Sequence, residues 1–282
     1  MSDLADKTFI ITGANTGIGK ITARELAKRG ARVILACRSK DKTLPVIAEI
    51  KQETGNDKIE FVQLDLGDLA SVRTCAAELV ARDIPFDGLI NNAGLAGQRG
   101  KTVDGFELTF GTNHLGHYLF TRLLLDRLKQ AGTARIVNVS SKSHYSAKGI
   151  DWDALQKPTK TVTALKEYEV SKLANVLFTK ELARRLTGTK VTTYAVHPGV
   201  VATDVWRKVP APVRWVMKKF MITPEQGALS SLRCATDPEL ATETGRYYTD
   251  NGQERKPNPL ADDTALAATL WQKSAEWTGL PA

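Results

Sequence analysis

Cysteine is scarce in this chain, and its placement excludes two common kinds of site. The three cysteines are Cys37, Cys75 and Cys234. They lie far apart, they are odd in number, and none belongs to a CxxC pair, so they match neither a disulfide framework nor a zinc site. We therefore predict that they are small, reduced core residues of a cytoplasmic protein.

Long apolar runs and blocks of like charge are also lacking. No stretch approaches the roughly 18 uninterrupted apolar residues of a membrane-spanning helix, and the opening MSDLADK predicts no signal peptide. No run of roughly five or six like charges is present, which argues against nucleic acid as a partner. The formal net charge of +8 fits either ordinary solubility or an attraction to anions such as phosphates.

Short β-branched runs alternate with longer helical patterns along the chain. We expect strands at 9–12, 31–37, 59–65, 86–94, 134–141, 191–197 and 245–250, and the longest helical pattern at 106–129. Strands that alternate with helices pair in parallel through right-handed crossovers. The predicted fold class is therefore α/β, a doubly wound parallel sheet of about seven strands with helices on both faces. No linker or repeat interrupts it, so we predict one domain over 1–282.

The segment TGANTGIGKIT, residues 12–22, connects the first expected strand to the first expected helix. A glycine-rich turn there lets the backbone approach a phosphate, which the N–H groups of the helix N-terminus can bind. Gly13, Gly17 and Gly19 do not have the G-x-G-x-x-G spacing, and Ile21 stands where a P-loop needs Ser or Thr. The turn indicates phosphate binding, and a glycine-rich turn that binds nothing is the alternative.

The second expected strand ends in Cys37-Arg38. Dinucleotide-binding folds usually have an acid at this point for the ribose 2′-OH, whereas a nearby arginine suits a 2′-phosphate. Here the acid is absent and Arg38 is present, and Lys20 or Lys40 could assist it. This favours NADP(H) over NAD(H), with a solvated loop arginine as the alternative.

Polar and glycine residues follow four more expected strands. They are Asp65, the NNAG sequence at 91–94, Ser140-Ser141 and the HPGVVAT sequence at 197–203. Ligands bind outside the carboxyl ends of the strands in such sheets, so these residues predict one site. Tyr168 and Lys172 lie four residues apart in a helical pattern, on the side opposite its apolar residues, and therefore adjoin. Taken alone, that pair also fits an ordinary surface helix.

In this order and on these elements, TGxxxGIG, NNAG, the serine pair, YxxxK and PGxxxT resemble the classical short-chain dehydrogenases/reductases. The phrases TGANTGIGK, TNHLGHYLF and TTYAVHPGV are similar to the retinol-dehydrogenase-like branch of that family. The resemblance runs from Thr8 to about Tyr248. It implies an oxidoreductase that interconverts a carbonyl and an alcohol, on an apolar substrate, with NADP(H) as the cofactor. A catalytically silent NADP(H)-binding sensor or scaffold is the alternative.

The resemblance also implies roles for individual residues. Tyr168 would be the general acid/base, and Lys172 would lower its pKa and hold the nicotinamide ribose. Ser141, the second serine of its pair, would bind the substrate oxygen, and Asn113 would hold the water of a proton relay. The implied cofactor contacts, besides Tyr168 and Lys172, are Gly13, Asn15, Thr16, Gly17, Ile18, Gly19, Arg38, Asp65, Leu66, Asn92, Ala93, Gly94, Pro198, Gly199, Val200 and Thr203.

Several features leave more than one interpretation. Tyr145 competes formally with Tyr168, but Gly149 stands where a lysine would be needed. The region at about 200–223 mixes apolar and basic residues. It could form a substrate-side lid, pack against the core or make at most weak peripheral contact with a membrane. We expect structural roles for His114, His117, Trp271 and Trp277, no metal site, and, from the family alone, a homodimer or homotetramer.

Overall fold

The computed structural model describes residues 2–200 and 222–282, and these form one seven-stranded parallel sheet. The strands are β1 (Thr8–Thr12), β2 (Arg32–Cys37), β3 (Ile59–Gln63), β4 (Gly88–Asn91), β5 (Arg135–Val139), β6 (Thr192–Val196) and β7 (Arg246–Tyr248). Their order across the sheet is β3-β2-β1-β4-β5-β6-β7. The chain order reverses between β1 and β4, which makes the ends of these strands the switch point where such folds bind ligands. The predicted fold class is confirmed.

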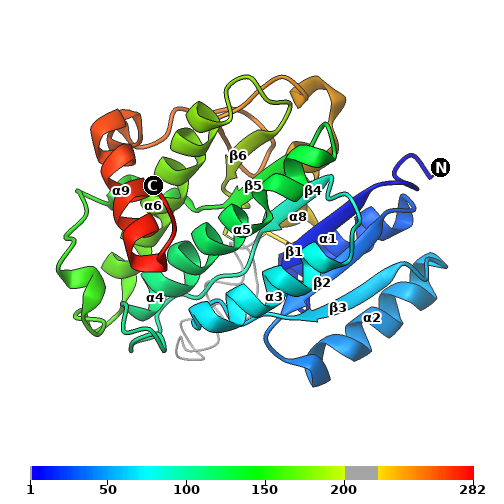
Figure 1. The fold of residues 1–282 in the computed structure, drawn as a ribbon, viewed down its shortest axis with the longest axis horizontal. Helices are drawn as coiled ribbons and strands as arrows, with labels where there is room; N and C mark the ends of the chain where they lie inside the picture. Colours follow the sequence, from blue (N-terminus) through cyan, green and yellow to red (C-terminus); the bar gives the residue numbers. More distant parts are fainter. Residues whose placement is uncertain (1, 201–221) are drawn as a thin grey trace.

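Helices cover both faces of the sheet (Figure 1). The longer ones are α1 (Gly17–Lys28), α2 (Lys40–Thr54), α3 (Leu69–Ala81), α5 (Gly116–Gln130), α6 (Leu165–Arg185), α8 (Pro224–Thr236) and α9 (Thr264–Thr278). Neighbouring strand residues point to opposite faces. Ile10 packs in the core beneath α3 and α5, and Ile11 packs in the core beneath α1, α2 and α8. Each fully buried isoleucine contributes about 1.5–3 kcal/mol to folding.

The region expected as one long helix is divided in the structure. It consists of a short α4 (Leu108–Phe110), a π-helical turn (Gly111–Leu115) and α5. The buried Glu107 carboxylate accepts the Phe110 N–H at 2.8 Å and so starts α4. The wider π turn carries Asn113, and such turns are frequent at functional sites. Hydrophobic periodicity alone does not distinguish this turn from regular α-helix.

Two helices near the C-terminus were not predicted, although both have local signals. Thr223 and Gln226 form a capping box at the start of α8. Asp263 accepts the N–H groups of Ala265 and Leu266 at the start of α9, and Gly279 ends it in the left-handed conformation. Helix α9 packs on α5 and α6, where Trp271 is buried against Phe178 and Tyr118. The structural role expected for this tryptophan agrees with that contact.

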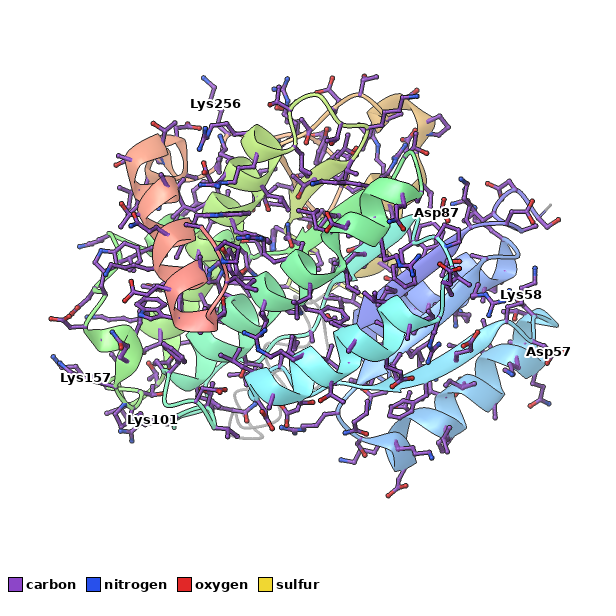
Figure 2. The ribbon with its side chains drawn as sticks, viewed as in Figure 1. Asp57, Lys58, Asp87, Lys101, Lys157 and Lys256 are labelled. Carbon is purple, nitrogen blue, oxygen red and sulfur yellow. The ribbon has the colours of Figure 1, made fainter. Side chains whose placement is uncertain are left out.

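The amino-terminal ends of the central strands β1 and β4 are joined by polar contacts. Asp87 precedes β4, and its carboxylate accepts the backbone N–H of Thr8 at 2.9 Å and the ammonium of Lys7 at 2.8 Å. Figure 2 labels this residue at the side of the molecule near the N-terminus. The predicted lid at about 200–223 lies mostly outside the described residues.

Candidate active site

The loops after β1 and β4 are joined to each other by hydrogen bonds at the switch point. The Thr12 hydroxyl oxygen accepts the backbone N–H groups of Asn92 and Ala93, both at 2.9 Å. The Asn92 amide donates to the Thr12 carbonyl at 2.8 Å. The glycine turn and the NNAG sequence, which are far apart in the chain, therefore form one continuous surface.

Glycine is required in the first turn for steric reasons. Gly13 has φ of 65°, and a Cβ there would lie 2.8 Å from the Cβ of Ala93. A Cβ on Gly19 would lie 2.5 Å from the Asn92 amide nitrogen. Helix α1 has no acidic residue in its first turn, so its positive end is not neutralised by its own side chains. A turn without side chains beside a helix N-terminus fits the pyrophosphate of a dinucleotide.

Two cations near this turn differ in their partners. Lys20 is held by Glu49 of α2, with Nζ–O distances of 2.6 and 2.7 Å, so it is not a free cation for a phosphate. Arg38 is exposed, and no carboxylate in the described parts of the chain pairs with it. Its carbonyl accepts the Gln63 side-chain amide at 2.6 Å, which fixes the backbone at the end of β2. Arg38 is therefore an exposed cation at the end of β2.

The remaining expected cofactor residues lie on neighbouring strand ends. The Asp65 carboxylate accepts the Gly67 N–H at 2.9 Å, and Leu66 is buried. Gly199 has φ of 88°, and the carbonyl of Val200 accepts the Ile222 N–H at 3.0 Å. Thr203 lies outside the described residues. The other members of the predicted set lie in the turn after β1, after β4 and after β6: Asn15, Thr16, Gly17, Ile18, Gly94 and Pro198.

Tyr168 and Lys172 adjoin on the first turns of α6. Lys172 is only 3% exposed, and its ammonium donates to the Val139 carbonyl at the end of β5, at 2.9 Å. Burial lowers the pKa of Lys172 to about 8. Burial also raises the pKa of Tyr168, and a hydrogen bond with Ser141 opposes that rise. The raised pKa of Tyr168 is opposite to the lowering expected from Lys172.

The two serines after β5 have different surroundings. Ser140 is buried and donates to the Lys172 carbonyl at 2.8 Å, so it fastens β5 to α6. Ser141 is partly exposed and is the serine that interacts with Tyr168. The choice of the second serine is thus consistent with the geometry. Tyr145, the rival tyrosine, donates its phenolic hydrogen to the Lys256 carbonyl at 2.6 Å, and Gly149 stands four residues after it.

Asn113 links the π turn to the Tyr168 turn. Its side-chain oxygen accepts the Leu95 N–H at 2.9 Å, and its amide nitrogen donates to the Leu95 carbonyl at 3.0 Å and to the Ser171 hydroxyl at 3.1 Å. Ser171 in turn donates to the Tyr168 carbonyl at 2.8 Å. Ser171 thus connects Asn113 to the backbone of Tyr168. Sequence reasoning missed this role because the partner lies far away in the chain.

The two histidines near Asn113 are buried and bonded to the protein. His117 Nε2 lies 2.9 Å from the Thr12 hydroxyl, and its Nδ1 lies 2.9 Å from the Asn113 carbonyl. His114 Nε2 lies 3.1 Å from the Ser274 hydroxyl of α9. Over residues 2–200 and 222–282, no cluster of three or more His, Cys, Asp or Glu residues could hold a metal ion. No helix in the same ranges is long and apolar enough to cross a membrane.

Comparison with known proteins agrees with this arrangement. The family model for short chain dehydrogenase matches residues 7–213. Human retinol dehydrogenase 11 is 45% identical over 281 residues, which cover 99% of this chain and 87% of that protein. An uncharacterized protein from Mycobacterium Paratuberculosis has a crystal structure with a TM-score of 0.78 and 35% identity, over 99% of this chain and 98% of that one. A Beutenbergia cavernae protein named as a putative NAD(P)-dependent gluconate 5-dehydrogenase, with NADP bound at low occupancy, has a TM-score of 0.71 and 26% identity, over 88% of this chain and 96% of that one.

Proposed function

Because the chain belongs to the short-chain dehydrogenase family, we propose that it interconverts a carbonyl compound and an alcohol with NADP(H) as the cofactor. One observation carries the proposal. A partly exposed tyrosine, a buried lysine and a serine hydroxyl meet at the carboxyl ends of the central strands, beside a glycine turn that fits a pyrophosphate. This is the combination that a carbonyl reduction needs, a proton donor, a cation and a hydrogen-bond donor beside a cofactor.

Tyr168 acts as the general acid when the carbonyl is reduced. Its high pKa keeps the phenol protonated at neutral pH, so it has a proton to give to the oxygen as negative charge develops there. The Ser141 hydroxyl donates a hydrogen bond to the same oxygen and stabilises that charge. The nicotinamide supplies the hydride when it is bound. In the reverse direction Tyr168 takes the alcohol proton back.

Lys172 and Asn113 support the proton donor from the protein side. The Lys172 ammonium would hold the nicotinamide ribose, and it favours the phenolate form of Tyr168 as the proton leaves. Asn113 is joined to the Tyr168 turn through Ser171, and its π turn would hold the water of the proton relay. The residues that would hold the dinucleotide are those of the glycine turn, Asp65-Leu66, the NNAG sequence and the Pro198–Val200 loop.

The preference for NADP(H) is proposed from charge. Arg38 is exposed and has no acidic partner in the described ranges, and Cys37 occupies the position where an acid would bind a 2′-OH. A guanidinium binds a phosphate through two parallel hydrogen bonds. The uncharged 2′-OH of NAD(H) cannot form this pair of bonds. The NADP bound at low occupancy in the Beutenbergia cavernae structure is in line with this choice.

An apolar substrate is proposed from the relatives. The human proteins that are 44% and 45% identical to this chain are named retinol dehydrogenases, after an apolar alcohol. The test is a screen of the purified protein with NADPH and a panel of aldehydes and ketones. Turnover is measured as a decrease in NADPH absorbance. Turnover with at least one apolar member supports the proposal. Tight NADPH binding with no turnover across the panel would instead support the silent sensor.

A further inference from the structure

His144 lies three residues after Ser141, and the proposed mechanism leaves it without a role. Its side chain is fully buried. Its Nδ1 lies 2.6 Å from the Ser141 carbonyl oxygen, and its Nε2 lies 3.0 Å from the backbone nitrogen of Asn258. A backbone N–H only donates, so Nε2 must accept. The ring proton is therefore on Nδ1, from which it is donated to the Ser141 carbonyl, and the ring is neutral.

Asn258 fastens the other end of this connection. It is 4% exposed, and its amide nitrogen lies 2.8 Å from the His144 carbonyl, 3.0 Å from that of Ala147 and 3.3 Å from that of Tyr145. Its amide oxygen accepts the Leu260 N–H at 2.9 Å. The amide nitrogen thus faces carbonyl oxygens and the amide oxygen faces an N–H group, which fixes the orientation of the amide. One asparagine thus ties the turn after Ser141 to the segment that follows β7.

The connection ends on the peptide group of Ser141 itself. The Ser141 carbonyl accepts both the ring N–H and, at 3.1 Å, the backbone N–H of His144. The hydroxyl of Ser141 accepts the Ser143 N–H at 3.2 Å. Rotation of the Ser141 backbone would break the bond to the His144 ring and leave a buried ring N–H without its acceptor, which is unfavourable. The ring therefore restricts where the hydroxyl of Ser141 can point.

We propose that His144 and Asn258 are positioning residues for Ser141, so that the segment after β7 sets the orientation of the hydroxyl that meets the substrate oxygen. The inference rests on the proposed function, because the orientation of Ser141 matters only if the chain turns over a carbonyl or an alcohol. Burial lowers the pKa of His144, which keeps the ring neutral and the connection intact at neutral pH.

Two substitutions at His144 separate its two bonds. In His144→Asn the shorter amide reaches the position of Nδ1, so it can still donate to Ser141 but cannot reach Asn258. In His144→Gln the longer amide reaches the position of Nε2, so it keeps a contact with Asn258 and loses Ser141. We expect kcat within about threefold of wild type for the first and at least tenfold lower for the second, because small misplacements of a reacting group are costly. The Kd for NADPH should change little in both.

Tyr145→Phe is the matched control. Its hydroxyl also joins the same two segments, through the carbonyl of Lys256, but it does not touch Ser141. The side chain of Lys256 points outward in Figure 2, so only the backbone of this residue takes part. We expect near-wild-type kcat for this variant. Asn258→Ala should lower kcat as His144→Gln does, and combining the two should add little, because both break one connection.

The outcomes separate the inference from the proposed function. If the wild type is inactive with every carbonyl tested, the proposed function fails and the inference fails with it. If the wild type is active and the Asn and Gln variants lose kcat equally, or neither loses any, only the inference is overturned. Nitrogen NMR of the wild type gives a test without any variant. A neutral His144 protonated on Nδ1 is expected, and a proton on Nε2 would overturn the inference.

Discussion

The ammonium nitrogen of Lys172 lies 5.5 Å from the centroid of the Tyr168 ring, one turn further along α6. Both groups are in a site of low polarity, which disfavours the charged form of each. Burial accordingly raises the pKa of Tyr168 and lowers that of Lys172 to about 8. In the free protein the pair therefore consists of a protonated phenol and a lysine ammonium that loses its proton more readily than usual.

The charge of Lys172 predicts a loss of activity in mild alkali. Its folded pKa of about 8 is below the ordinary value of 10.5, so the ammonium loses its proton as the pH rises past 8. We expect kcat/KM for NADPH in carbonyl reduction to fall above that pH, up to about tenfold per pH unit. Lys172→Arg keeps its charge throughout, so its lower activity should not show this fall. An unchanged fall in the arginine variant would assign it to another group.

Arg38 predicts the choice of cofactor. The wild type should use NADPH with a higher kcat/KM than NADH, and Arg38→Ala should lower the value for NADPH by about tenfold or more with little effect on NADH. Lys20→Ala is the control, because Glu49 already neutralises that lysine, and it should leave the ratio nearly unchanged. Equal efficiency of the wild type with both cofactors would refute the prediction.

The histidines predict a loss of stability in acid. The chain has four, and all are buried. Burial lowers the pKa of His114 to about 3 and those of His117 and His197 to about 4, and it also lowers the pKa of His144. The unfolded chain therefore binds more protons than the folded one below about pH 6.5. The free energy of unfolding should fall by up to about 1.4 kcal/mol per pH unit for each histidine.

Urea unfolding at several pH values between about 6.5 and 5 measures this slope, in a range where most carboxylates have not yet titrated. The stability that each buried neutral histidine maintains is fully present above the pKa of histidine in the unfolded chain, and it is lost as the pH falls below that value. His114→Gln should remove one such contribution, so its slope should be smaller although its stability at neutral pH is also lower. A stability that does not change over this range would show that the histidines titrate normally.

An apolar substrate pocket predicts a trend with chain length. Along a series of straight-chain aldehydes, kcat/KM should rise by up to about fourfold for each added methylene that is buried, the equivalent of about 0.8 kcal/mol. The expected plateau marks the length of the pocket. A flat or falling series from the shortest member would remove the claim of an apolar pocket without affecting the reaction type.

The fold and much of the site could be predicted from the sequence because their signals are local. The β-branched runs marked every strand of the sheet, although the run at 86–94 was too long because Asn92 and Gly94 leave the ladder to form the site. In a parallel sheet the carboxyl ends of the strands lie on one side, so the polar and glycine residues after the strands are expected to lie in one site. Helices α8 and α9 were missed even though Thr223 and Asp263 cap them.

The rest could not be predicted because it depends on contacts between distant residues. The sequence offers Lys20 as a second cation for a phosphate, but it does not show that Glu49 of α2 pairs with this lysine. Ser171 had no evident role without Asn113, and the hydrogen bond that joins them spans 58 positions. The pKa of Tyr168 is raised, opposite to the expected lowering, because the phenol is buried, and the sequence does not show that burial.

The central claim is that Tyr168 is the proton donor, and Tyr168→Phe tests it most directly when measured beside Tyr145→Phe. The first variant keeps the ring and loses the proton, so kcat with the best carbonyl from the screen should fall by about 10²-fold or more while the Kd for NADPH stays near its wild-type value. Tyr145→Phe should turn over nearly as the wild type does. An active Tyr168→Phe, or a comparable loss in Tyr145→Phe alone, would contradict the account.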